Sequence, residues 1–358
     1  MNLFLAGCWD QHQLVNKTFV NGISFDLTDE GKIQVIVRVL DIKGKGGGQY
    51  DIKDELIYAD RPSPVGLAID IDSMVAGEVD FSQAHILLIG DEMAKNGISQ
   101  LLEPFYRGKD SNITQKIAIT KGEAETIIAT EKEKSPIAFF ILQAIEGAEK
   151  STYLPTENVS TVWTKTLTPG KDMFLPYLEK VEPNKIGIAG VALFNGDKFS
   201  GKTLSKEQSS LLLLLLDQLK VTNRMALILN QEQEERPIAF STRKMKRDME
   251  IKVDKTSGKI TCSVEISLQI EVNSYPQNFT EKMNLKKIEK ELAVELTKQA
   301  KEIIMTLLQA NCDAFGIGMK ISSKHPDLWK KMNWDEEYKN VQIEPKVNVK
   351  TIKTGNVY

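Results

Sequence analysis

The clearest regularity in the chain is a strict alternation of apolar and polar residues over positions 260–272. A period of two is typical of a β-strand with one buried face, because successive side chains point to opposite sides of a strand. Residues 249–253 have apolar residues at the same spacing, and a polar turn at 254–258 separates the two segments. The pattern therefore predicts a hairpin within a sheet that buries one of its faces.

A long amphipathic helix is predicted after this hairpin, from about residue 281 to residue 311. The segment contains no Gly or Pro, and at 1.5 Å per residue it would be about 45 Å long. A further strand is predicted at 347–352. We expect an α+β domain in which an antiparallel sheet packs against the long helix. The apolar stripe that would cover the sheet consists of Leu285, Ile288, Leu292, Leu296, Ile303 and Leu307.

The first half of the chain alternates short apolar runs with helical segments. A hairpin is predicted from strands at 18–27 and 33–42, and Gly44 to Gly48 follow as a loop. These alternations favour a mixed α/β region, so the whole chain is predicted to be a multi-domain α+β protein. The other predicted elements are strands at 86–89 and 115–120, helices at 65–76, 99–106, 135–147 and 206–220, and a second hairpin at 186–194 and 198–202.

Composition narrows the range of functions. The 358 residues suggest two or three domains, because a domain usually has about 100 to 200 residues. The 46 Lys and Arg nearly balance the 49 Asp and Glu, so no strong field of one sign would attract nucleic acid, and no such partner is expected. The longest apolar runs, such as Leu211 to Leu216, have six residues. Because a membrane-spanning helix needs about 20, no transmembrane segment is predicted.

No catalytic residue, metal ligand or cofactor site is predicted. The histidines at positions 12, 85 and 325 have no helical i, i+4 spacing, and neither a nucleophile elbow nor a phosphate loop occurs. The glycines at 44–48 suit a hairpin loop better than a nucleotide loop, because the residues after them do not open a helix. Asp70 and Asp72 are expected on a solvated face, since nothing positions a second catalytic group beside them.

Two cysteines and two tryptophans of the second half are candidates for buried positions. Cys262 occupies one of the apolar positions of the alternating strand, and Cys312 follows the long helix. We therefore expect two buried hydrophobic residues rather than a disulfide. Trp329 and Trp334 follow the long helix as well. Two interpretations stay open for them: they close the core, or they present an aromatic contact to a partner or to a membrane.

The first ten residues predict a lipid anchor. Apolar residues lead into Leu5, Ala6, Gly7 and Cys8, which have the pattern of a lipobox with Cys8 as the lipidated residue. A four-residue match fits an ordinary buried cysteine equally well, but its place after apolar residues favours the lipobox. Signal peptides start with positive charge, which this sequence lacks, so we expect that its start is truncated. Trp9 and Asp10 lie beside the anchor and either contact lipid or a partner, or form a simple tether.

Several short motifs follow one another in a fixed order along the chain. They are Gly7-Cys8-Trp9-Asp10 with Gln13-Leu14, Gly22-Ile23-Ser24-Phe25-Asp26, residues 85–98, Gly190-Val191-Ala192-Leu193-Phe194 with Gly201, Asp313-Ala314-Phe315-Gly316-Ile317-Gly318, Trp329, Trp334 and residues 349–355. Their order and spacing resemble those of the Ger(x)C lipoproteins, the C subunits of nutrient-germinant receptors of spore-forming bacteria. The resemblance extends from about Cys8 to Gly355.

This resemblance implies a non-catalytic lipoprotein that is required for germination in response to nutrients. Its expected location is the outer leaflet of the spore inner membrane, held there by acylated Cys8. Its expected partners are the A and B type integral membrane subunits of the receptor. The implied organisation is a signal-peptide remnant with the lipobox at 1–8, an N-terminal region of two subdomains at 9–182, and a C-terminal domain at 185–355.

Two other functions fit the sequence less well. A solute-capturing lipoprotein that binds a nutrient directly would need two similar lobes of parallel sheet around a cleft, and the antiparallel pattern of the C-terminal half disfavours it. A lipid-anchored hydrolase is disfavoured because the sequence offers no nucleophile constellation.

Overall fold

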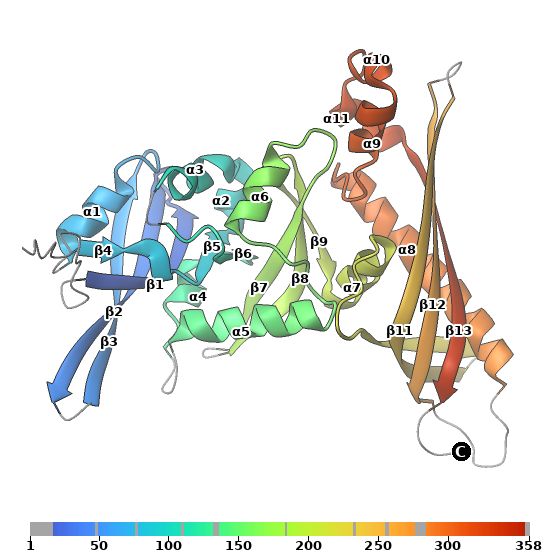
Figure 1. Cartoon of the computed structure of the whole chain (residues 1–358), viewed down its shortest axis with the longest axis horizontal. Coiled ribbons are helices and arrows are strands. Elements are labelled where there is room, and N and C mark those ends of the chain that lie inside the picture. Colours follow the sequence, from blue (N-terminus) through green and yellow to red (C-terminus); the bar gives the residue numbers. More distant parts are fainter. Residues whose placement is uncertain are drawn as a thin grey trace, which may run out of the picture.

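The computed structural model describes residues 17–46, 49–75, 78–108, 111–131, 136–182, 185–231, 234–254, 258–275 and 284–354. Within these residues the chain forms two β-sheets that follow one another along the long axis of the molecule, with helices packed on their faces (Figure 1). The mixed α+β class predicted from the sequence is confirmed. No helix among the described residues is long and apolar enough to cross a membrane.

The first sheet has nine strands and a parallel centre between antiparallel ends. Its order is β3-β2-β1-β5-β6-β7-β8-β9, with β4 beside β1. The central strands β5 and β6 are almost entirely buried, as expected for parallel strands that are covered on both faces. The strands are β1 (Lys17–Leu27), β2 (Ile33–Gly46), β3 (Gln49–Arg61), β4 (Glu78–Asp80), β5 (Ile86–Gly90), β6 (Lys116–Thr120), β7 (Phe174–Glu182), β8 (Lys185–Asn195) and β9 (Lys198–Ser205).

Helices cover both faces of this sheet, and the alternation within β5 shows the division. Ile86 and Leu88 belong to one core, whereas Leu87 and Ile89 belong to the other. The helices that join the first core are α4 (Glu125–Ile128), α5 (Ile137–Lys150) and α7 (Lys206–Leu215). Those that join the second are α1 (Leu67–Met74), α2 (Asp91–Asn96), α3 (Ser99–Arg107) and α6 (Val159–Thr166), with the 3-10 turn η2 (Phe81–Gln83) beside them.

The second sheet has four strands in the order β10-β11-β12-β13. The strands β10 (Arg224–Gln231), β11 (Glu234–Val253) and β12 (Ile260–Ser274) are antiparallel, whereas β13 (Gln342–Thr354) runs parallel to β12. Helix α8 (Leu285–Gln309) packs on the inner face, where Ile288, Leu292 and Leu296 are buried. The predicted alternation in β12 is confirmed, because its even-numbered residues from 260 to 272 are all buried.

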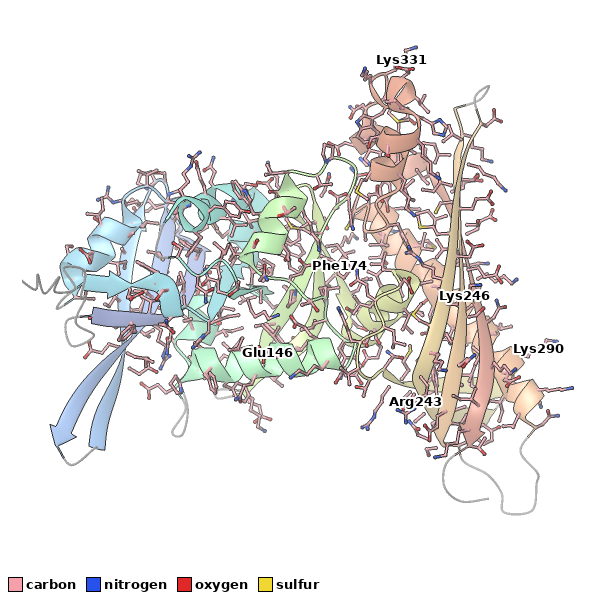
Figure 2. The ribbon with its side chains drawn as sticks, in the orientation of Figure 1. Glu146, Phe174, Arg243, Lys246, Lys290 and Lys331 are labelled. Carbon is pink, nitrogen blue, oxygen red and sulfur yellow. The ribbon has the colours of Figure 1, made fainter. Side chains whose placement is uncertain are left out.

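One core connects the two sheets. The buried leucines of α7 belong to the same cluster as the inner face of β12 and the stripe of α8. Phe174, at the start of β7, also belongs to this cluster and lies near the middle of the molecule (Figure 2). Four short elements complete the chain between α8 and β13: α9 (Ile317–Lys324), α10 (Pro326–Trp329), α11 (Trp334–Glu337) and the 3-10 turn η3 (Tyr338–Asn340).

Several predicted boundaries were wrong, including the start of β13, which lies at Gln342 rather than at residue 347. The glycine-rich segment is shorter as a loop than predicted, since β2 continues to Gly46 and β3 begins at Gln49. Helix α7 ends at Leu215 rather than at residue 220, because Asp217 adopts a left-handed backbone with φ of 63°. Strand β11 is far longer than the predicted 249–253, because charged residues interrupt its apolar pattern.

Candidate functional site

The proposed anchor residues Leu5, Ala6, Gly7, Cys8, Trp9 and Asp10 lie outside the described residues, so the predictions about them stay predictions. The described chain starts at Lys17, where β1 pairs with Glu78 of β4. This start lies at the opposite end of the long axis from the second sheet (Figure 1). Any anchor on Cys8 is therefore attached to the end of the molecule that carries β1.

The two tryptophans of the candidate site come together between α10 and α11. The ring centroids of Trp329 and Trp334 are 5.7 Å apart, and those of Trp334 and Tyr338 are 5.8 Å apart. Tyr338 is buried and donates a hydrogen bond of 2.8 Å to the carbonyl of Cys312. Both tryptophans are half-buried and pack against the shared core. Each leaves part of its surface exposed, so a contact with a partner stays a prediction.

The motif Asp313 to Gly318 shapes the backbone beneath these rings. Asp313 is fully buried, and its carboxylate accepts hydrogen bonds from the amides of Ile317 (2.9 Å) and Gly318 (2.8 Å), at the start of α9. A β-carbon at Gly318 would lie 2.5 Å from the Trp334 ring and 2.8 Å from the α-carbon of Gly170. Only glycine fits at this position, which explains the last residue of the motif.

A second carboxylate connects this motif to the first sheet. Asp172, which precedes β7, accepts hydrogen bonds from the amide of Asp313 (2.7 Å) and from the amide of Gly196 (2.8 Å) in the β8–β9 turn. Its own amide donates to the carbonyl of Asp313 (3.0 Å), and the amide of Met319 donates to the carbonyl of Gly170 (2.8 Å). Backbone groups from three parts of the chain thus meet at two acids, which we call the acid junction.

Burial dominates the electrostatics of the acid junction. It raises the pKa of Asp313 to about 7, against the opposing effect of the two backbone amides that bind the carboxylate, and the charge of Asp172 raises it further. The pKa of Asp172 is raised as well, again chiefly by burial. The carboxylate oxygens of both acids accept hydrogen bonds from backbone amides. They therefore fix the loops that join the two sheets.

Above the acid junction lies a groove of about 460 Å³ between the first sheet and the last helices. Trp329 and Trp334 line one side of it, and Lys171, Asp197 and Lys198 lie among the residues of the other. The groove joins the exposed parts of both tryptophans to charged side chains.

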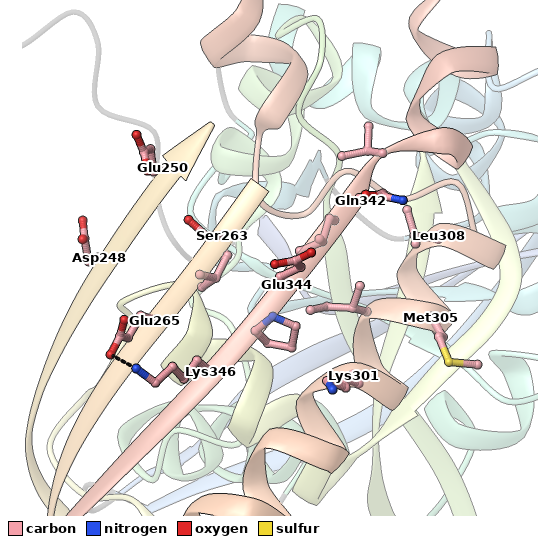
Figure 3. A pocket seen from close by; sticks show the side chains of 15 residues that line it. Asp248, Glu250, Ser263, Glu265, Lys301, Met305, Leu308, Gln342, Glu344 and Lys346 are labelled. Carbon is pink, nitrogen blue, oxygen red and sulfur yellow. Dashed lines mark hydrogen bonds and ion pairs between the residues drawn. The ribbon is translucent and has the colours of Figure 1, made fainter. Parts of the chain in front are cut away.

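A hollow of about 870 Å³ lies between α8 and the first half of β13. In Figure 3, Lys301 and Met305 extend from α8, while Glu344 and Lys346 extend from β13. Lys346 forms an ion pair with Glu265 of β12 at 3.0 Å. No group of His, Cys, Asp or Glu among the described residues could hold a metal ion. This hollow is an open, charged surface.

The remaining candidates have structural roles. Cys262 and Cys312 are buried and free, and burial raises the pKa of the Cys262 thiol to about 12. The prediction of two buried cysteines without a disulfide between them is confirmed. Asp70 forms an ion pair with Arg61, and Asp72 accepts a hydrogen bond from the Val79 amide (3.1 Å).

Sequence reasoning missed the role of Asp26 at the end of the Gly22 to Asp26 motif. Its buried carboxylate accepts hydrogen bonds from the amides of Ala124 (2.7 Å) and Glu125 (2.8 Å), at the start of α4. Burial raises its pKa to about 6. A β-carbon at Gly90 would lie 2.1 Å from one of its oxygens, so the glycine before α2 is required as well. An aspartate between the apolar residues Phe25 and Leu27 was the available signal.

Comparison with known proteins gave consistent matches over nearly the whole chain. The family model of the spore germination protein N-terminal domain matches residues 10–180, and the model described as spore germination B3/GerAC like, C-terminal, matches residues 189–355. The chain is 21% identical over 357 residues to the spore germination protein GerQC of Bacillus cereus, covering 99% of this chain and 97% of that protein.

Two further matches agree with these. The chain is 22% identical over 385 residues to the spore germination protein KC of Bacillus subtilis (strain 168), covering 99% of this chain and 93% of that protein. The crystal structure of the GerBC protein is similar with a TM-score of 0.59 at 16% identity, and the match covers 92% of this chain and 97% of that one. At this identity the structural match shows a shared fold.

Proposed function

Because the chain belongs to the Ger(x)C family of spore germination proteins, we propose that it is the lipid-anchored, non-catalytic C-type subunit of a nutrient germinant receptor. In this function Cys8 carries the lipid, and the protein stands on the outer leaflet of the spore inner membrane. Its partners are the A and B type integral membrane subunits. The domains are a lipobox region at 1–8, an N-terminal region at 9–182 and a C-terminal domain at 185–355.

One observation carries this proposal: the N-terminal and C-terminal family models match in order and together cover most of the chain from residue 10 to residue 355. The acids at the acid junction support a non-catalytic role, because their oxygens bind backbone amides. The exposed parts of Trp329 and Trp334 suit a contact with a membrane subunit, since aromatic residues are enriched in protein interfaces.

The anchor rests on the pattern Leu5-Ala6-Gly7-Cys8. Each buried methylene of a lipid chain contributes about 0.8 kcal/mol, so two acyl chains hold a protein stably where one is marginal. From Cys8 to Lys17 the backbone can extend about 3.5 Å per residue, which limits the tether to about 30 Å. The end of the body that carries β1 is therefore held close to the membrane.

Replacement of Cys8 tests the proposal in sporulating cells that express the chain with a complete signal peptide. We expect Cys8→Ala to leave the membrane fraction and to impair nutrient germination, whereas the control Gln11→Ala keeps the lipobox and both properties. Mass spectrometry of the mature control protein should show an acylated Cys8. Membrane retention and normal germination of Cys8→Ala would contradict the anchor.

One observation favours a second candidate function, direct binding of a nutrient. A cavity of about 300 Å³ lies between the first sheet and helices α1 and α3, and apart from Ser111 its lining residues are apolar. Ligand sites of proteins begin at about this volume. Calorimetry of the full chain against amino acids and sugars separates the two functions, because tight one-to-one binding would support the nutrient-binding protein.

A further inference from the structure

The outer face of the second sheet is exposed, and its residues lie in register across three strands. Lys246 pairs with Ser267, which pairs with Asn348 of β13. In the next row on this face, Lys244 pairs with Gln269, which pairs with Lys350. Successive rows on one face are about 7 Å apart, because a strand rises by about 3.3 Å per residue.

A third row completes a cationic strip. Glu271 of β12 forms ion pairs with Arg243 (2.6 Å) and with Lys353 (3.5 Å), whose side chains are about half exposed. We define the cationic strip as Arg243, Lys244, Lys246, Lys350 and Lys353. The five cations of the strip and the one carboxylate among them, Glu271, give a net charge of +4. Figure 2 labels Arg243 and Lys246 in the second sheet, far from the end with β1.

Three of these cations lack compensation within the protein. Lys244, Lys246 and Lys350 are exposed, and no ion pair joins them to a carboxylate in the described part of the chain. Like charges placed near each other on a sheet destabilise it. The spacing of about 7 Å between successive rows is similar to the Debye length of about 8 Å at physiological salt, so salt screens the repulsion between the lysines only in part. The strip therefore keeps a positive potential that an external anion would neutralise.

The same face changes sign toward its other end. Asp248, Glu250, Glu265 and Glu344 occupy the preceding rows, where Lys252 and Lys346 are the matching cations. The whole chain has a net charge of −3, so the positive charge is concentrated locally rather than spread over the molecule. This separation would orient the face toward an anionic surface, with the strip nearest to it.

We propose that the cationic strip binds the anionic headgroups of a lipid membrane. The residues that lie beside the lysines in these rows on β12 and β13 are Ser267, Gln269 and Asn348. They provide none of the apolar or aromatic centre that stable protein interfaces have. Lysines on a polar face instead suit the layer of phosphate groups at a membrane surface. There, each lysine adds separately to the electrostatic attraction.

Resting on the proposed function, this contact adds a second attachment to the lipid on Cys8. The tether of about 30 Å attaches the end with β1, and the strip lies at the opposite end of the long axis. Attachment at both ends lays the elongated body along the membrane instead of letting it swing from one end. The exposed groove beside Trp329 and Trp334 would then be held at a fixed height above the bilayer.

Vesicle sedimentation of the full chain tests the strip, with Cys8→Ala in every protein so that lipidation plays no part. We expect the Cys8→Ala chain to bind vesicles of phosphatidylglycerol and phosphatidylcholine, but not vesicles of phosphatidylcholine alone. Binding should weaken as salt is raised. Adding Lys244→Glu, Lys246→Glu and Lys350→Glu should lower the affinity at least tenfold, because each lysine contributes separately to the attraction.

A matched control variant has the same total charge as the triple variant of the strip. Lys330→Glu, Lys331→Glu and Lys339→Glu reverse three exposed lysines near α10 and α11, and this variant should bind like the Cys8→Ala chain. Circular dichroism of both triple variants checks that each is folded. Equal loss of binding in the two variants, or no binding of the Cys8→Ala chain to anionic vesicles, would overturn the proposal. Because lipidation is absent throughout, either result leaves the Cys8 anchor to be judged by its own experiment.

Discussion

Replacing Asp313 by asparagine should change how the stability of the protein depends on pH. Burial raises the pKa of this carboxyl from its usual 3.8 to about 7 in the folded chain. Between these values the unfolded chain has released the proton while the folded chain still holds it. The free energy of unfolding therefore falls as the pH rises through this window, and it levels off above the folded pKa.

The magnitude follows from the width of this window. One pKa unit corresponds to about 1.4 kcal/mol, so the shift from 3.8 to about 7 costs the wild type roughly 4 kcal/mol at neutral pH relative to acid pH. The asparagine side chain of the variant would not titrate. Its oxygen can accept from one of the amides of Ile317 and Gly318, and its own amide group faces the other, which costs about 1 to 3 kcal/mol at every pH.

Urea denaturation from acid to mildly alkaline pH, followed by tryptophan emission, measures the difference between wild type and Asp313→Asn. We expect the variant to be the less stable protein in acid, and the gap to close or reverse as the pH passes 7. Asp26, whose pKa is raised to about 6, titrates in both proteins and cancels in the difference. A gap that stays constant over the whole range would refute the account of Asp313 as a buried acid with a raised pKa.

Two further predictions concern packing at the acid junction and the thiols. Gly318→Ala should destabilise the protein by about 1 to 3 kcal/mol, since its β-carbon would collide with an indole ring. Gly147→Ala, in α5, is the control, because no atom lies within 4 Å of the added carbon. Replacing Gly by Ala within a helix stabilises it by up to about 1 kcal/mol, so thermal melting should separate the two variants. In the Cys8→Ala chain, Cys262 and Cys312 should react with a thiol reagent only after unfolding; labelling of the native protein would contradict their burial.

The sequence predicted those parts of the fold in which local pattern and burial agree. Strand β12 alternates at every position, so its face could be predicted residue by residue. Strand β11 has 20 residues but was predicted for only five, because Arg247 occupies an inner position and bonds the carbonyl of Leu215 (3.3 Å). A cation on the buried side breaks the alternation on which the prediction depends.

The acid junction could not be predicted, because it joins residues far apart in the chain. Asp172 and Asp313 are 141 residues apart, and each looks like an ordinary polar loop residue in its local sequence. The full burial of Asp313 and the partial burial of Asp172 result from the meeting of the two sheets. The motif around Asp313 was found by resemblance, while its partner Asp172 carried no local signal.

The edge of the second sheet explains why a contact of this domain would use its outer face. β13 is an edge strand, and such strands invite pairing with other chains. Here α8 covers the free edge: the amide of Val347 donates to the Thr297 hydroxyl (3.1 Å), and the amide of Thr351 donates to the Glu289 carboxylate (2.6 Å). Pro345 has no amide proton to offer. Since α8 also covers the inner face, the outer face with the cationic strip is the open surface of β12 and β13.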